Sequence, residues 1–225
     1  MDVSGKYAEE GKSLNAIDSL QRALEIYDKL DDGKGGTVGW TAFTIGTLYY
    51  NRSVDELNMN YGADVEDKDL DKAEFYCRKG LDAVRFLPIL KEPEIVKWFY
   101  LCRIKLGAIL GRQHKFEEAE EQLKIGEILA TQIHEENSTV HGDIYMLLGQ
   151  LYKDQKRFKD AEEYYKKSLK IKKRLYDVDK QHRIQELYFR IGNMCKEQGK
   201  FDKAEKWHGK MSFAYQMENN LCVIS

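Results

Sequence analysis

Proline is nearly absent, because the 225 residues contain only Pro88 and Pro93. Proline removes a backbone donor and clashes with the preceding helical turn, so its scarcity favours long helices. No apolar run approaches the roughly 18 residues of a membrane-spanning helix, so none is predicted. The first residues also lack the apolar stretch of a secretory signal.

The sequence also has few cysteines and almost no net charge. The four cysteines are far apart and form no CxxC pair, which favours a reducing, cytoplasmic location. Lys and Arg number 36 against 38 Asp and Glu, a net charge of −2, so no nucleic-acid partner is expected. An apolar content of 42% is too high for a disordered chain.

What the sequence does contain is an internal repeat. A large apolar residue is followed within two or three positions by alanine and then by charged residues. In four copies this alanine is Ala73, Ala119, Ala161 or Ala204, and in a weaker copy it is Ala16. The last three steps between these alanines are 46, 42 and 43 residues, and the first is 57, which indicates an insertion.

Small residues accompany each copy at fixed offsets. Gly107, Gly149 and Gly192 each lie 12 residues before an alanine. Seven residues after each alanine comes another slim or flexible side chain, namely Ala23, Gly80, Gly126, Ser168 and Met211. Small residues let two helices approach closely, and a helix pair with one apolar face must stack on further copies.

This pattern resembles the tetratricopeptide repeat family. Residues 144–152 with Phe158 and Ala161 match its order of small residue, tyrosine, aromatic residue and alanine. Residues 188–193 with Gly199, Phe201 and Ala204 match equally well. The long steps resemble those of kinesin light chain. Met211 and the missing closing prolines depart from the family pattern.

The resemblance implies an all-α, right-handed solenoid of about five antiparallel helix pairs over residues 1–218. The expected repeats are 1–31, 38–87 with an insertion at 51–68, 93–134, 139–176 and 181–218. Helices are expected at 3–10, 13–30, 38–54, 69–86, 93–112, 116–133, 139–154, 158–175, 181–197 and 201–217.

No catalytic or cofactor-binding motif stands out. Gly33-Lys34-Gly35-Gly36-Thr37 lacks the GxxxxGK[ST] spacing of a phosphate-binding loop, so a linker is expected. The acidic residues 64–71 lack the glycine and final glutamate of a calcium loop. The five histidines show no metal-ligand spacing. We therefore expect neither an enzyme nor a metal or cofactor site.

The family resemblance implies that the first helix of each pair lines a groove for peptides. Carried over to this chain, the polar lining residues are Tyr50, Asn51, Lys105, Arg112, Gln150, Lys153, Arg190 and Asn193. Because Lys and Arg pair with carboxylates, an acidic or C-terminal peptide is the expected ligand. An ordinary solvated helix face is the equal alternative.

A clamp for chaperone tails is not expected. In the family, that clamp needs Lys and Asn on one helix, Asn on the next, and a Lys and Arg pair on the third. The corresponding pairs here are Leu101/Lys105, Asp143/Leu147 and Glu186/Arg190, and none fits.

The last four residues, Cys222-Val223-Ile224-Ser225, form a CaaX box, which predicts farnesylation of Cys222 in the tail 219–225. One prenyl chain anchors only marginally, so a basic patch would have to assist it. The candidates are Lys166, Lys170, Lys173 and Arg174. The alternatives are an apolar tail that covers the last helix, and a basic face that serves only solubility.

These observations predict a non-catalytic adaptor that holds a partner segment in a preformed groove. A farnesyl group on Cys222 would tether this adaptor to the cytosolic face of a membrane. A structural subunit that stacks end to end in a larger assembly, such as a cytoskeletal or ciliary one, is the alternative.

Overall fold

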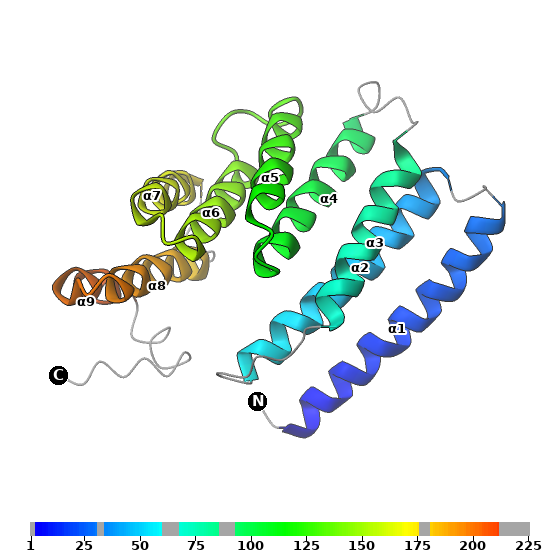
Figure 1. The fold of residues 1–225 in the computed structure, drawn as a ribbon, viewed down its shortest axis with the longest axis horizontal. Coiled ribbons are helices and arrows are strands. Elements are labelled where there is room, and N and C mark those ends of the chain that lie inside the picture. The colour runs from blue at the N-terminus through cyan, green and yellow to red at the C-terminus, as the bar shows by residue number, and fades with distance from the viewer. Residues whose placement is uncertain (1–2, 31–33, 60–67, 86–92, 176–180, 212–225) are drawn as a thin grey trace. The chain divides into compact units, whose positions relative to one another are not determined.

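The computed structural model describes residues 3–30, 34–59, 68–85, 93–175 and 181–211, and in these ranges the chain folds into helices without a strand (Figure 1). The helices are α1 (Val3–Leu30), α2 (Gly36–Met59), α3 (Lys68–Val84), α4 (Pro93–Arg112), α5 (Phe116–Thr131), α6 (Thr139–Asp154), α7 (Phe158–Leu175), α8 (Gln181–Glu197) and α9 (Phe201–His208). The predicted all-α repeat architecture is confirmed.

The chain divides into two compact units. Unit 1 is Met1–Ile133 and holds α1 to α5, and unit 2 is His134–Ser225 and holds α6 to α9. The boundary lies one residue before the end of the predicted repeat 93–134. None of the described helices is both long and apolar enough to cross a membrane.

Four helix pairs, α2/α3, α4/α5, α6/α7 and α8/α9, share one packing rule. A glycine of the first helix faces the residue that lies four positions after the repeat alanine in the second helix. An added Cβ would lie 2.8 Å from Cys77 Sγ at Gly46, 2.7 Å from Leu123 Cγ at Gly107 and 2.6 Å from Tyr165 Cδ1 at Gly149, and at Gly192 it would collide with His208. The four repeat alanines are buried, so the small residues do set the helix spacing.

The turns inside three of these pairs repeat as well. His114, Lys156 and Gly199 have left-handed backbone φ angles of 59°, 59° and 71°. The next residue donates its N–H to a carbonyl five positions back: Lys115 to Leu110, Arg157 to Tyr152 and Lys200 to Cys195, at 2.8 to 2.9 Å. This is the Schellman arrangement, which satisfies the last carbonyls of a helix.

Three helix boundaries differ from the expected ones. α1 runs unbroken through Gly11, so the expected helices 3–10 and 13–30 are one, and α1 has no described partner of the first-helix type. One internal glycine costs a helix only about 1 kcal/mol, which the rest of a long helix can offset.

The second and third differences concern the ends of α2 and α9. α2 continues to Met59, so the first half of the expected insertion is helical, and 60–67 lie outside the described residues. α9 stops at His208 instead of 217. After Gly209, the N–H groups of Lys210 and Met211 donate hydrogen bonds to carbonyls three positions back, so the helix ends there.

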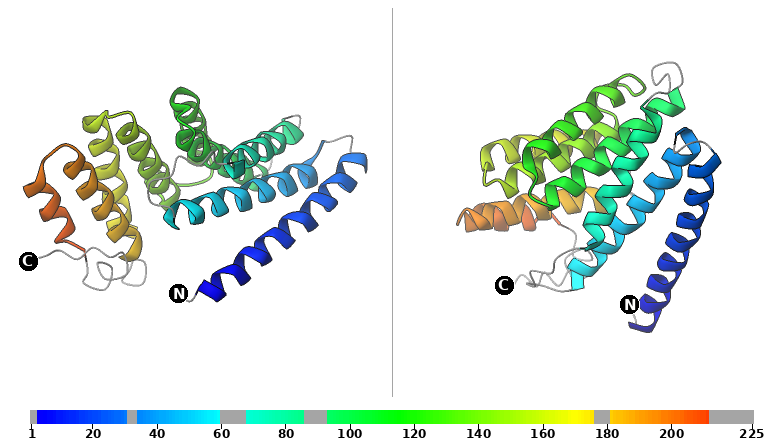
Figure 2. Two further views of the ribbon diagram at one scale, coloured as in Figure 1. Left: turned by 60° about the horizontal axis from the view of Figure 1, so that its bottom comes forward. Right: turned by 45° about the vertical axis from the view of Figure 1, so that its right-hand side comes forward.

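α1 packs along α2 in unit 1, as Figure 2 shows. Ile17 and Leu24 are 1% and 4% exposed on the packed side of α1. The Gln21 side chain donates to the Tyr76 hydroxyl at 2.8 Å, and Lys79 of α3 pairs with Asp28. These contacts fix α1 to α2 and α3.

Candidate binding surface

Three of the predicted lining residues meet between α2 and α4. The Lys105 ammonium lies 4.6 Å from the centre of the Tyr50 ring, and the Arg112 guanidinium lies 5.7 Å from it. Lys105 and Arg112 are two helical turns apart and therefore share one side of α4. A cation over an aromatic face is stabilised by roughly 0.5–2 kcal/mol, more where water is excluded. Tyr50 thus holds both cations in one place.

The positive charge at this point has no counter-charge among the residues whose side chains the structure describes. Neither Lys105 nor Arg112 forms an ion pair with any residue that the structure describes. Burial lowers the pKa of Lys105, only partly opposed by the neighbouring Cys77. A half-buried cation that lacks a carboxylate pays a desolvation cost, which a carboxylate from another molecule could offset.

The thiol of nearby Cys77 is a poor nucleophile near neutral pH. Burial raises the pKa of the Cys77 thiol to about 12, so the thiol remains protonated near neutral pH. The thiolate, and not the thiol, is the nucleophile, so Cys77 serves packing against Gly46.

Aromatic side chains extend this surface toward the start of α2. Trp40 is 55% exposed, and its ring lies 6.1 Å from that of Phe43. Phe43 in turn meets Trp98 of α4 edge to face at 6.2 Å. We call the side of α2 and α4 that carries Trp40, Phe43, Tyr50, Lys105 and Arg112 the α2–α4 face. Asn51 is exposed next to Tyr50.

The predicted residues of unit 2 are arranged differently, because they satisfy one another. The Gln150 carbonyl oxygen accepts bonds from Arg190 at 2.8 Å and from the Tyr165 hydroxyl at 3.0 Å. Arg190 also pairs with Glu186 at 2.7 Å. Lys153 pairs with Glu197 at 3.2 Å and with Asp154 at 3.3 Å. The two predicted cations of this groove in unit 2, Lys153 and Arg190, therefore already have carboxylates. Asn193 is half-exposed on α8.

Residues of the predicted basic patch lie on α7 and are only partly available. Lys166 pairs with Glu162 at 2.6 Å, and Arg174 donates to the Asn137 carbonyl at 3.0 Å. Lys173 lies 5.4 Å from the centre of the Tyr188 ring, and Lys170 is exposed.

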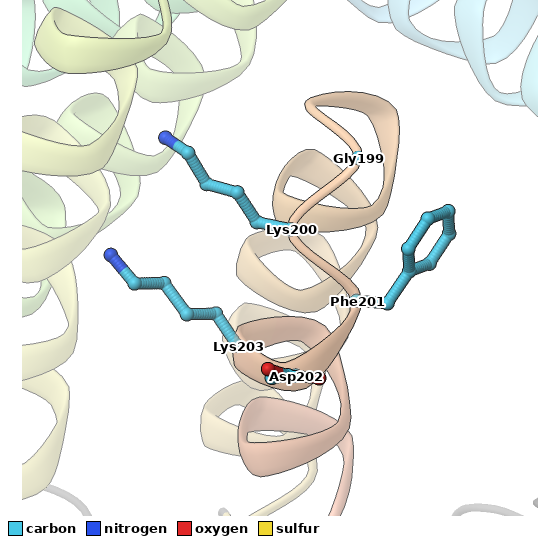
Figure 3. A pocket seen from close by; sticks show the side chains of 5 residues that line it. All are labelled: Gly199, Lys200, Phe201, Asp202 and Lys203. Carbon is cyan, nitrogen blue, oxygen red and sulfur yellow. The ribbon is translucent and has the colours of Figure 1, made fainter.

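Two lysines that the sequence analysis missed belong with this patch. The hydrogen bond from Lys166, together with the charges of Lys203 and Lys200, lowers the pKa of Glu162. Lys200 and Lys203 reach out on one side of the α8–α9 turn and Phe201 on the other, around a cavity of about 270 Å³ (Figure 3). The sequence analysis did not group these lysines with α7 because about 30 residues separate them from it. The signal that could have found them is the repeat register, in which α7 and α9 are both second helices of a pair.

Two expectations are not decided by these observations. Cys222 and the whole tail 219–225 lie outside the described residues, so the CaaX prediction rests on sequence alone. In the part of the chain that the structure describes, no three His, Cys, Asp or Glu side chains are grouped to hold a metal ion.

Comparison with known proteins agrees with the repeat geometry. Residues 100–174, from α4 to α7, match the family model described as tetratricopeptide repeat. Residues 100–174 therefore carry tetratricopeptide repeats. Such repeats bind other proteins, so the chain is a protein-interaction scaffold.

A solved structure of another protein has a similar fold. The crystal structure of BtubC (BKLC) from P. vanneervenii is similar over 88% of this chain and 71% of that one, with a TM-score of 0.62 and 20% identity. At this identity the likeness concerns the helical repeat fold. No curated protein matches the sequence.

Proposed function

We propose that this tetratricopeptide repeat chain is a non-catalytic scaffold that captures an acidic peptide segment of a protein partner on its α2–α4 face. The observation that carries the proposal is the pair of cations, Lys105 and Arg112, gathered over Tyr50 without a carboxylate from the described residues. A side-chain or C-terminal carboxylate of the partner would supply the missing charge.

The two cations suit different parts of this task. The Arg112 guanidinium can hold both oxygens of a carboxylate in a fixed, bidentate geometry. The Lys105 ammonium is a compact charge whose partial burial strengthens its attraction to an anion. Exposed Trp40, ten residues before Tyr50 on α2, offers apolar area at the other end of the same face.

The contrast with unit 2 supports this choice of surface. An acidic ligand at Lys153 or Arg190 would have to displace Glu197 or Glu186, and each exchange would replace one ion pair with another. Such an exchange gains little free energy. At the α2–α4 face, no carboxylate of the described residues would have to be displaced.

The experiment measures the affinity of a labelled Glu-rich peptide by fluorescence anisotropy, with the Gln-substituted peptide as the ligand control. Lys105→Met and Arg112→Met should each weaken binding about tenfold or more, as expected for the loss of a charged hydrogen bond of roughly 1.5–3 kcal/mol. Lys97→Met removes an exposed charge from the same helix and should change affinity less than threefold. Equal losses in all three variants would show non-specific attraction and overturn the proposal.

A further inference from the structure

α1 presents an open side that every other second helix of a pair keeps covered. In the repeat register Ala16 corresponds to Ala73, Ala119, Ala161 and Ala204. Those four alanines are at most 4% exposed, because the first helix of their own pair covers them. Ala16 is exposed, and no described helix plays that part for α1.

The open side of α1 has a regular pattern, which we call the α1 seam. Its residues recur at alternating steps of three and four, so they share one side of the helix, as in a two-helix coiled coil. Its members are Ser13, Ala16, Leu20, Ala23, Tyr27 and Leu30. All six are half-buried or exposed, Leu30 to 73%, and none is charged.

The rest of α1 separates this seam from other contacts. Ile17 and Leu24, on the adjoining side, are already buried in unit 1. Asp18 and Glu25 are exposed and lie across the helix from the seam. A second helix can therefore approach the seam without meeting a row of charges or disturbing the contacts with α2.

The seam is complementary to itself in one orientation only. If two α1 helices lie antiparallel with their midpoints together, every layer joins a small residue to a large one. The layers are Ala16 with Tyr27, Ala23 with Leu20, and Ser13 with Leu30. A parallel pair would oppose Tyr27 to Tyr27 and Ala16 to Ala16, which leaves both clashes and voids.

We infer that a second copy of this chain covers the α1 seam, with the two α1 helices antiparallel across a twofold axis. Twofold pairing is the commonest form of self-association, and it requires a patch that complements itself. The seam follows the size rule that closes the four described helix pairs, a small residue against a large one. The inference does not depend on the peptide-binding proposal.

Sedimentation equilibrium of the full chain, from about 1 to about 200 µM, tests the inference. The wild-type chain should show a monomer–dimer equilibrium in that range. Ala16→Glu should weaken it about tenfold or more, because it buries an unpaired charge in the seam. The matched control, Asn15→Glu, adds the same charge to an adjacent, exposed position and should leave the equilibrium within about twofold. Circular dichroism checks that both variants retain the wild-type helix content.

A swap of sizes tests the antiparallel layer directly. Ala16→Tyr alone should weaken the dimer about tenfold, because it opposes two tyrosines. Ala16→Tyr combined with Tyr27→Ala restores one small and one large residue to each layer and should recover most of the affinity. A wild-type monomer at all concentrations, an unaffected Ala16→Glu dimer, a double variant no better than Ala16→Tyr, or a seam filled by another protein instead would each overturn the inference.

Discussion

Lys105 Nζ of α4 lies 4.6 Å from the centre of the Tyr50 ring of α2, and so joins the first helices of two successive pairs. A single aromatic ring thereby places two cations, Lys105 and Arg112, on one surface. Neither cation pairs with a carboxylate of the described residues. That combination distinguishes the α2–α4 face from the internally paired cations of unit 2.

The affinity for an acidic peptide should depend on pH through Lys105. Burial lowers the pKa of Lys105, so its charge is lost at a lower pH than that of an ordinary lysine. Binding should therefore weaken as pH rises through alkaline values at which exposed lysines are still charged. Lys105→Arg should remove this dependence, because guanidinium stays protonated. Anisotropy titrations across pH measure it, and identical pH profiles for wild type and Lys105→Arg would contradict the assignment.

The stability of unit 2 should depend on the small size of Gly149. An added Cβ would lie 2.6 Å from Tyr165 Cδ1, so Gly149→Ala should reduce the free energy of unfolding by about 1–3 kcal/mol. Gly36→Ala is the matched control, since its Cβ would meet nothing within 4 Å. Urea denaturation followed by circular dichroism gives both values. A Gly149→Ala variant as stable as Gly36→Ala would refute close helix contact.

The left-handed turn residue between α6 and α7 offers a gain in stability. Lys156 has φ 59°, a conformation that costs a non-glycine residue about 1 kcal/mol. Lys156→Gly should therefore raise the free energy of unfolding by several tenths to about 1 kcal/mol. Lys170→Gly, an exposed position inside α7, should lower it by about 0.5–1 kcal/mol.

Gly199 occupies the equivalent turn between α8 and α9, with φ 71°, and gives the opposite test. Gly199→Ala has open space for its Cβ but not a favourable backbone, so it should lower the free energy of unfolding by about 1 kcal/mol. A neutral result in urea denaturation would show that the turn relaxes to another conformation.

The repeat architecture could be predicted from the sequence because it depends on residue size at fixed offsets. Gly149 and Tyr165 meet as the spacing requires, and so do Gly107 and Leu123. The prediction of a break in α1 was wrong, because a helix of this length tolerates Gly11.

The electrostatics of the surface could be predicted only in part. The convergence of Lys105 on Tyr50 follows from the positions that face each other on successive first helices. The pairing of Arg190 with Glu186 and of Lys153 with Glu197 depends on side-chain rotamers and on the separation of neighbouring helices. A linear sequence does not specify either of these, so the sequence pattern could not separate the open cations of unit 1 from the paired ones of unit 2.

Chemical-shift mapping of the ¹⁵N-labelled chain with a short Glu-rich peptide tests the central claim most directly. The account predicts that the largest shifts fall on the backbone amides of Tyr50, Lys105 and Arg112 and are absent with the Gln-substituted peptide. Shifts centred on Gln150, Lys153 and Arg190, or spread evenly over exposed lysines, would contradict it.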